Sequence, residues 1–270
     1  MQFYKVLIVG YGNIGTHLYE ELNVPGVDIY VYDPFKNADV PRYTNNLEHI
    51  NNVQFDLAFV CVPTEMKEDG SCDISQVTEA VYSLAKTVNP KIIVIKSTIP
   101  VGTCDTISKS ISNIVFSPEY YGTTIHAPKK LDFVVLGGEK DLCIPVANFY
   151  YSIKSGSLRI KFTDFKTAEL AKYMENCFLA MKVAFCSEFA IIADEFGINY
   201  PELREIFVLD ERMGESHTLI HPDQPYYDSH CLNKDIPGLI KQSDEAKLMK
   251  AVDEINRERK TRKINEKRNV

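Results

Sequence analysis

Short apolar runs rich in β-branched residues recur through the first half of the chain, and they constrain its fold more than any other feature. Most of them lack polar alternation, as expected for strands buried on both faces, and amphipathic stretches such as 76–87 separate some of them. This pattern predicts an α/β fold with a doubly wound parallel sheet covered by helices. The predicted strands are Lys5–Val9, Asp28–Tyr32, Leu57–Val62, Ile92–Ile95, Ile114–Phe116 and Phe133–Leu136.

The second half of the chain is predicted to be all-helical. Residues 166–196 contain neither Gly nor Pro, apolar residues recur there at helical spacing, and Gly197 favours a helix end. At a rise of 1.5 Å per residue this stretch predicts one long central helix of about 46 Å. A shorter helix is expected over 199–207, then a polar loop from roughly 211 to 230, and then a last helix.

Length and composition fit a globular protein of two domains. The chain has 270 residues, of which 45% are hydrophobic and 25% charged. We expect a sheet domain over 1–155 and a helical domain over 156–270. A net charge of −7 argues against general nucleic-acid binding, and no apolar run is expected to be long enough to span a bilayer.

The start of the chain and its cysteines indicate the compartment. Met1 leads directly into a predicted strand, without the basic region, apolar stretch and cleavage site of a signal peptide. The seven cysteines follow neither the spacing of a disulfide framework nor a CxxC metal pattern. Both observations predict a cytoplasmic protein with free thiols and no metal site.

A glycine motif, GYGNIG, lies directly between the first predicted strand and an amphipathic helix. Its glycines permit a tight turn, close approach of a pyrophosphate and close helix–strand packing, which together predict a Rossmann-type NAD-binding domain. Asp33 ends the second strand, where a carboxylate can bind an adenosine ribose and would repel a 2′-phosphate, so NAD is favoured over NADP. The alternative is a glycine-rich turn followed by a capping Asp. The motif residues expected to contact NAD are Gly10, Gly12, Asn13, Ile14 and Gly15.

Several further segments resemble one family, and they occur in the same order from Gly10 to Asp235. They are CVPT at 61–64 continuing as EMKEDGSCDIS, KSTIPVGT at 96–103, SPEY at 117–120, AELAKYMENCFLAMKVAFCSEFA at 168–190, DERMGESHT at 210–218 and CLNKD at 231–235. Together they are similar to the nucleotide-sugar dehydrogenases, typified by UDP-glucose and GDP-mannose dehydrogenases. The resemblance implies that a primary alcohol of a UDP-sugar is oxidised twice, through a thiohemiacetal and then a thioester on a cysteine.

The resemblance also implies roles for particular residues. Cys231 would be the nucleophile, just before a predicted helix start at 235–237 where the dipole favours a thiolate. Lys172 and Asn176, four residues apart on one helix face, would stabilise an oxyanion. Asp235 would act with the lysine in the first proton transfer, and Glu119 would activate water. The remaining implied contacts, to water or cofactor, are Thr98, Val62, Pro63, Thr64 and Lys234.

Each of these residues also has a simpler interpretation. A lone cysteine is most often a buried, inert thiol, and a helix lysine is most often a solvated charge. Asn176 can be an incidental polar residue in mid-helix, and Asp235 at a helix start would be an N-cap. Thr98, two residues before a proline, can simply shape a turn.

The sequence departs from the family at three points. The stretch before Cys231 is YYDSH at 226–230, where the family carries a glycine-rich stretch, and Thr123 stands where the family often has a second acid. Family members also continue into another Rossmann-like domain that binds the substrate nucleotide, which is not expected within these 270 residues.

Three functions are compatible with these features. The first is an NAD-dependent nucleotide-sugar dehydrogenase, the second a one-step 3-hydroxyacid dehydrogenase that also uses a Lys-xxx-Asn pair, and the third a non-catalytic NAD-binding protein. The long helix predicts a homodimer, because its apolar residues exceed what one small domain can cover. Candidates for its exposed face are Tyr173, Phe178, Val183 and Phe185.

Overall fold

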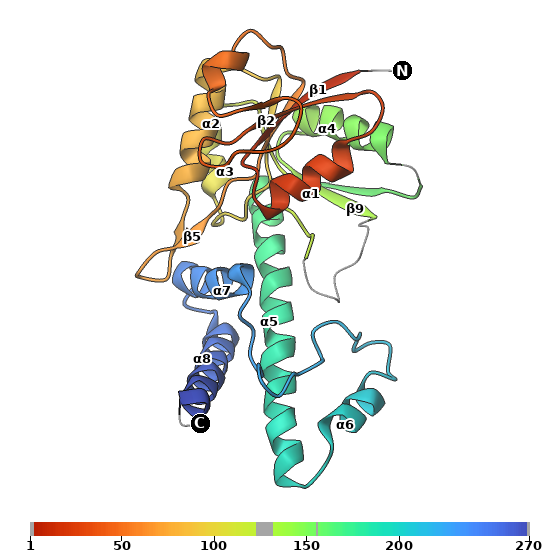
Figure 1. The fold of residues 1–270 in the computed structure, drawn as a ribbon, viewed down its shortest axis with the longest axis vertical. Helices are drawn as coiled ribbons and strands as arrows, with labels where there is room; N and C mark the ends of the chain where they lie inside the picture. Colours follow the sequence, from red (N-terminus) through yellow and green to blue (C-terminus); the bar gives the residue numbers. More distant parts are fainter. Residues whose placement is uncertain (1–2, 123–131, 155, 269–270) are drawn as a thin grey trace. The chain divides into compact units, whose positions relative to one another are not determined.

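The computed structural model describes residues 3–122, 132–154 and 156–268 (Figure 1). The chain forms two compact units. Unit 1 contains most residues up to Lys172, and unit 2 contains residues 66–71 and those from Tyr173 onward. The predicted domain limits at 155 and 156 stay a prediction. Thr123 lies outside the described residues.

An eight-stranded sheet, in the order β10-β9-β8-β7-β4-β1-β2-β3, forms the centre of unit 1 (Figure 1). Neighbouring strands run parallel except β8 and β9, which pair antiparallel through Phe116 and Gly137. The chain leaves β1 on one side toward β2 and returns on the other side as β4, so the sheet has a switch point between β1 and β4, where such sheets bind ligands. The strands of this sheet are β1 (Tyr4–Val9), β2 (Val27–Tyr32), β3 (Tyr43–Thr44), β4 (Leu57–Val60), β7 (Ile92–Ile95), β8 (Ile114–Phe116), β9 (Phe133–Gly137) and β10 (Arg159–Thr163).

Helices cover both faces of this sheet because each buries one apolar stripe. Val77, Val81 and Leu84 of α2 pack on one face, and Leu18 and Leu22 of α1 pack on the other. The fold is therefore doubly wound, and the predicted Rossmann-type architecture is confirmed. The remaining elements of the first 155 residues are α1 (Asn13–Leu22), η1 (Leu47–Ile50), the β5–β6 ladder (Glu65–Met66 and Cys72–Asp73), α2 (Ser75–Thr87), α3 (Thr103–Ser108) and α4 (Lys140–Ile153).

Two strands of the sheet were not predicted. β3 has only two residues, and β10 is an edge strand whose side chains are exposed or half-buried, so neither produces the apolar run by which buried strands are recognised. β10 follows residue 155 in sequence and pairs in register with β9. The sheet therefore extends past the predicted limit of the first domain.

Helix α5 (Phe165–Glu195) begins in unit 1 and continues through unit 2, within one residue of the predicted long helix. The expected shorter helix is also present as α6 (Tyr200–Phe207), capped by the Asn199 side chain. The prediction of a single last helix is wrong, because α7 (His230–Gln242) and α8 (Lys247–Arg268) follow the loop. The residues that form the core of unit 2 are Cys177, Ala180, Ala184, Tyr227, Leu232, Ile236, Met249 and Val252.

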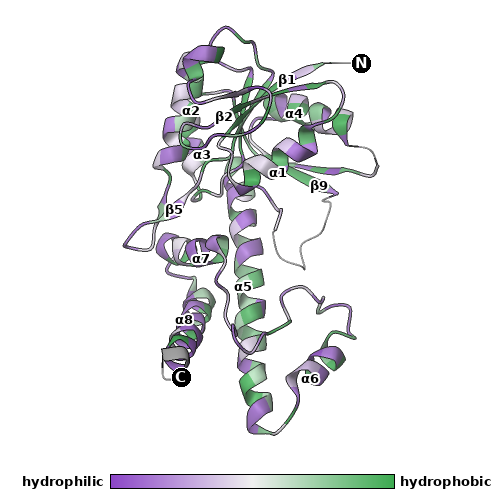
Figure 2. Cartoon of the chain, in the orientation of Figure 1, coloured by the Kyte–Doolittle hydropathy of each residue, from purple (hydrophilic) through white to green (hydrophobic). Residues whose placement is uncertain are grey.

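Apolar residues dominate α5, which is mostly green in Figure 2. By length and composition alone this helix could cross a membrane, although part of it is buried in the protein. The expectation that no apolar run is long enough to span a bilayer is therefore wrong. Core helices of soluble proteins pass the same test, and Ala168 and Tyr173 of α5 are fully buried. Tyr173 is thus also wrong as a candidate for the exposed face, whereas Phe178 and Phe185 are exposed.

Candidate functional site

The glycine motif forms the turn from β1 into α1. A Cβ on Gly10 would lie 2.9 Å from the carbonyl oxygen of Cys61 at the end of β4, and its φ is +89°. A Cβ on Gly15 would lie 2.0 Å from the carbonyl oxygen of Gly10, so the helix packs directly on the turn. At Gly12, by contrast, no heavy atom of the described residues lies within 4 Å of such a Cβ. The first and third glycines are required by packing, and the second leaves space for a ligand.

Asp33 lies at the end of β2, beside this turn. Its Oδ2 accepts a hydrogen bond from the Tyr11 N–H group at 2.8 Å, and its Oδ1 accepts from the N–H groups of Phe35 and Lys36 at 2.9 and 3.0 Å. The buried carboxylate therefore joins the glycine turn to the loop after β2, where a ribose would be bound.

These residues fit a dinucleotide. Within the described part of the chain, α1 has no side-chain cap at Gly12 and no acidic residue in its first turn, which begins with Asn13 and Ile14. Its first N–H groups and the positive end of its dipole can therefore bind a pyrophosphate, with space above Gly12 and a carboxylate at Asp33.

The loops after β4 and β7 lie at the same sheet edge. Val62 is half-buried and Pro63 is exposed, whereas Thr64 is buried. The Ser97 hydroxyl donates a hydrogen bond to the Val62 carbonyl at 2.6 Å, which joins the two loops next to the half-buried Thr98. These predicted cofactor contacts therefore share one edge of the sheet with the glycine turn.

Glu119, after β8, is bound on both oxygens. Its Oε1 accepts hydrogen bonds from the N–H groups of Tyr120 and Tyr121, each at 2.9 Å, and its Oε2 lies 3.2 Å from Nζ of Lys96. The two charged side chains are 10% and 6% exposed. Burial alone would raise the pKa of Glu119, but Lys96 and the Tyr121 N–H group hold that pKa below its usual value. Glu119 is thus an ionised carboxylate.

Lys96 is a site residue that sequence reasoning missed. It belongs to the KSTIPVGT segment, but no role was assigned to it. Its signal is a lysine directly after the buried run Ile92–Ile95, at a position that the sheet buries. Burial lowers the pKa of this amine, but Glu119 outweighs that effect and the pKa is raised, so Lys96 is a cation.

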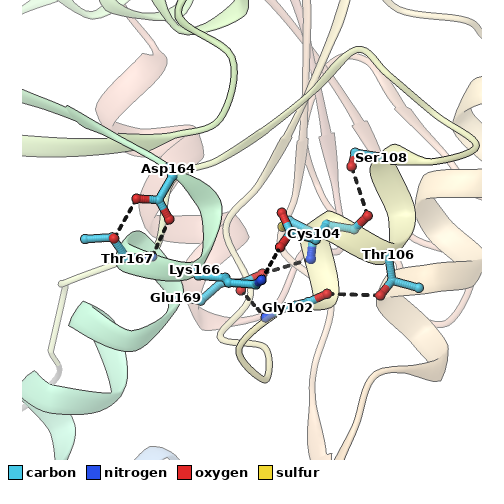
Figure 3. A network of polar contacts seen from close by, with 9 residues as sticks. Gly102, Cys104, Thr106, Ser108, Asp164, Lys166, Thr167 and Glu169 are labelled. Carbon is cyan, nitrogen blue, oxygen red and sulfur yellow. Dashed lines mark hydrogen bonds and ion pairs between the residues drawn. The ribbon is translucent and has the colours of Figure 1, made fainter.

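A second buried carboxylate, Glu169 of α5, fixes the loop that carries Thr98 (Figure 3). Its Oε2 accepts from the Gly102 N–H group at 2.6 Å, and its Oε1 accepts from the Cys104 N–H group at 2.8 Å. Glu169 is completely buried and caps the start of α3. Lys172 lies one turn further along α5, buried, with its Nζ 4.8 Å from the centre of the Tyr120 ring.

In unit 2, Asn176 of α5 and Asp235 of α7 form a buried hydrogen bond of 2.5 Å, from Nδ2 to Oδ2. The other oxygen of Asp235 is paired with the Lys234 ammonium group. All three side chains are buried, and residues 59 positions apart are brought together. Asp235 lies inside α7 and is not an N-cap, so the simpler interpretation of this residue is wrong.

Cys231 lies in the first turn of α7, which begins at His230 and is capped by Ser229. The predicted helix start at 235–237 is therefore five residues too late. The sequence signal for the true start is Ser229, whose hydroxyl accepts from the Leu232 N–H group at 3.3 Å. Cys231 is exposed, and the other six cysteines, all within the described residues, are buried and form no disulfide.

No three His, Cys, Asp or Glu side chains gather as metal ligands in the described residues. The geometry defines a Rossmann-type dinucleotide-binding protein with a helical region that carries an exposed cysteine beside a buried Asn–Asp–Lys cluster.

Two domains of one known family match this chain. The NAD binding domain of the UDP-glucose/GDP-mannose dehydrogenase family matches residues 36–153, and the central domain of that family matches residues 166–258. The chain belongs to the UDP-glucose/GDP-mannose dehydrogenase family. This confirms the resemblance drawn from the sequence and the prediction of NAD as cofactor.

Individual proteins support this assignment. UDP-N-acetyl-D-mannosamine dehydrogenase of Methanocaldococcus jannaschii is 28% identical over 93% of this chain and 65% of its own length. The solved UDP-glucose dehydrogenase of Pyrobaculum islandicum superposes with a TM-score of 0.80 at 20% identity, over 95% of this chain and 68% of that one. A Mycobacterium tuberculosis 3-hydroxyisobutyrate dehydrogenase has the same fold, with a TM-score of 0.71 at 15% identity over 95% and 94% of the two chains. The chain spans 65% of the length of the Methanocaldococcus relative and 49% of the length of the UDP-glucose 6-dehydrogenase of Rickettsia prowazekii.

Proposed function

We propose that this protein oxidises a primary alcohol of a nucleotide sugar to a carboxylate, with NAD as hydride acceptor. The observation that carries the proposal is the arrangement on α7, where an exposed cysteine in the first helical turn is followed by buried Lys234 and Asp235, with Asp235 bonded to Asn176. Burial of a Lys, an Asp and an Asn is unfavourable, and apolar residues could pack in the same place without that cost in free energy. These residues are therefore proposed to be retained for chemistry.

The roles follow from the chemical groups. Cys231 adds to the aldehyde carbon after the first oxidation, and its place in the first turn of a helix favours the thiolate that this step needs. Lys172 and Asn176 supply a cation and an amide for the developing oxyanion. Asp235 takes part in the first proton transfer, and Glu119, held ionised by Lys96, orients the water that hydrolyses the thioester.

The cofactor residues are proposed on the unit 1 edge. Gly10, Gly12 and Gly15 with Asn13 and Ile14 hold the pyrophosphate, and Asp33 holds the adenosine ribose. Val62, Pro63, Thr64 and Thr98 border the same edge, and Lys234 is proposed as a further contact. When bound, NAD would accept one hydride in each oxidation, first from the alcohol carbon and then from the thiohemiacetal carbon.

The deciding experiment measures NADH produced per substrate molecule. The protein is incubated with NAD and, separately, with UDP-glucose, UDP-N-acetylmannosamine, GDP-mannose and a set of 3-hydroxyacids. Two NADH per nucleotide sugar, with a carboxylate product, support the proposal. One NADH per 3-hydroxyacid supports the second candidate, which the Lys172–Asn176 spacing and the shared fold favour. Tight NAD binding with no oxidation in the panel would favour a non-catalytic protein.

We further propose a cytoplasmic homodimer that binds neither membranes nor nucleic acid. Phe178, Phe185 and Phe189 are exposed at 54%, 45% and 40% along α5, and an apolar helix face of this size is stable in water when a second copy covers it. The same face offers an explanation of the high hydropathy of α5 without a membrane.

A further inference from the structure

Helix α8 holds the segment that leads into Cys231, first through Asn256. The Tyr227 N–H group donates to Oδ1 of Asn256 at 2.8 Å, and Nδ2 of Asn256 donates back to the Tyr227 carbonyl at 3.1 Å. Both residues are 5% exposed. One carboxamide therefore satisfies both backbone groups of a buried residue, as a neighbouring strand would do.

The next residue, Asp228, provides a second point of attachment. Its Oδ1 accepts from Nζ of Lys260 in α8 at 2.5 Å and from Nδ2 of Asn233 in α7 at 2.7 Å. Partial burial would raise the pKa of Asp228, but the Lys260 and Asn233 donors hold that pKa below its usual value. Asp228 thus connects α8 to the first turns of α7 as an ionised group.

The third residue, Ser229, starts α7. Its hydroxyl accepts from the Leu232 N–H group at 3.3 Å, and its carbonyl accepts from the Asn233 N–H group at 3.1 Å. Cys231 follows two residues after this cap and is exposed. The three consecutive residues 227, 228 and 229, which shortly precede the thiol, therefore each have a defined hydrogen-bond partner. No glycine lies between 226 and 230 to give the backbone other conformations.

We infer that Asn256 and Lys260 of α8 are positioning residues for Cys231, because they fix the start of the helix that presents the thiol. The consequence for reactivity rests on the proposed role of Cys231 as nucleophile. Both side chains act through residues 227–229, because Asn256 binds the backbone of Tyr227 and Lys260 binds Asp228. Helix α8 therefore supports the proposed catalytic cysteine indirectly. Loss of the Asn256 and Lys260 contacts should disorder the first turn of α7.

The experiment compares Lys260→Met and Asn256→Ala with two reference variants of the full chain. Lys260→Arg retains a cation for Asp228. Lys263→Met removes a lysine of the same helix that instead pairs with Glu266 at 2.6 Å. Hydrogen exchange at the amides of residues 232 and 233 measures the order of the first turn of α7.

A second readout is the rate at which iodoacetamide alkylates the native protein at pH 7. It reports on Cys231, because the other six cysteines are buried, and burial raises the pKa of Cys61 and Cys177 to about 12. Cys231 is already accessible, so disorder of the turn adds little access. Disorder of the turn instead removes the aligned N–H groups that favour the reactive thiolate. Alkylation of Cys231 should therefore slow.

Asn256→Ala should raise exchange at residues 232 and 233 about tenfold, as expected for loss of buried hydrogen bonds. Lys260→Met should raise it about threefold, because the Lys260–Asp228 ion pair is partly exposed, and both variants should slow alkylation at least about twofold. Lys260→Arg and Lys263→Met should match the wild type in both readouts. Wild-type exchange or wild-type alkylation in Lys260→Met would overturn the inference. If Asn256→Ala fails to fold, Lys260→Met decides alone, since its side chain is 39% exposed.

The outcome is separable from that of the proposed function. Exchange and alkylation judge the positioning role even if the wild-type protein oxidises no nucleotide sugar. If it does oxidise one, Lys260→Met should lower kcat for carboxylate formation and leave the KM for NAD unchanged. Slowed alkylation with an unchanged kcat would support the positioning role and would count against the proposed role of Cys231 as nucleophile.

Discussion

Replacing Lys96 by methionine should destabilise unit 1 by about 3 kcal/mol at pH 7. The ammonium group lies 3.2 Å from Oε2 of Glu119, and the two side chains are 6% and 10% exposed. At an effective dielectric constant of about 20, charges at this distance attract by about 5 kcal/mol. Removing one partner of a buried pair typically costs about 3–5 kcal/mol. We expect the lower end, because two backbone N–H groups continue to bind Oε1 of Glu119.

The loss should depend on pH in a defined direction. In the wild type the pKa of Glu119 is lowered by Lys96 against burial. Its ionisation therefore stabilises the fold above the unfolded pKa of about 4.3, and this stability is lost as the pH falls through the lower folded pKa. Without Lys96 the same carboxylate is buried without a cation, and its pKa should rise. The difference in free energy of unfolding between Lys96→Met and the wild type should thus be largest near pH 7 and shrink toward pH 5.

Urea unfolding at pH 7 and pH 5 measures this difference. Lys91→Met is a matched control, because Lys91 lies 2.7 Å from Asp56 but is 70% exposed, and such surface pairs contribute less than about 1 kcal/mol. Adding Glu119→Gln to Lys96→Met should recover most of the stability by removing the buried charge. The reasoning is refuted if Lys96→Met costs no more than Lys91→Met, or if its cost is the same at both pH values.

Four further predictions concern the cofactor, the thiol and assembly. Gly12→Ala should keep the melting temperature and weaken NAD binding in calorimetric titration, whereas Gly15→Ala should lower the melting temperature, because its Cβ would lie 2.0 Å from a backbone oxygen. Asp33→Asn should narrow the preference for NAD over NADP in the same titration; a wild type that prefers NADP would contradict the assignment. Cys231→Ser should stop carboxylate formation, followed by product chromatography, and leave NAD binding unchanged; continued carboxylate production would exclude the covalent mechanism. Phe178→Glu should convert a dimer to a monomer in light scattering, and a wild-type monomer at micromolar concentration would remove that proposal.

Local pattern was sufficient for the elements that bury a regular apolar face. The strands at 57–60, 92–95 and 114–116 and the helix at 165–195 were predicted within two residues of their observed ends. Each of these elements can be recognised by an uninterrupted apolar run or by apolar residues at helical spacing. β10 has no such pattern. It is an edge strand with mostly exposed side chains, and it forms because its backbone pairs with β9.

The start of α7 shows a different limit. The sequence predicts a helix start at 235–237, where Pro237 suits a first helical turn, whereas the observed helix begins at His230. In the structure Ser229 caps the helix that begins at His230, and Leu232 and Ile236 of its first two turns belong to the core of unit 2. Burial of Lys234 and Asp235 inside the helix follows from this start.

Motifs made of consecutive residues are sufficient to indicate the family and the cofactor, because the glycine turn, the acidic strand end and the cysteine motif are each read without knowledge of the fold. The partners of the buried polar side chains, by contrast, depend on the tertiary fold. Lys96 meets Glu119 because parallel strands β7 and β8 end at one edge, and Asn176 meets Asp235 across 59 residues because α5 packs against α7. The free energy of such a pair depends on distance and burial, and neither quantity exists until the chain has folded.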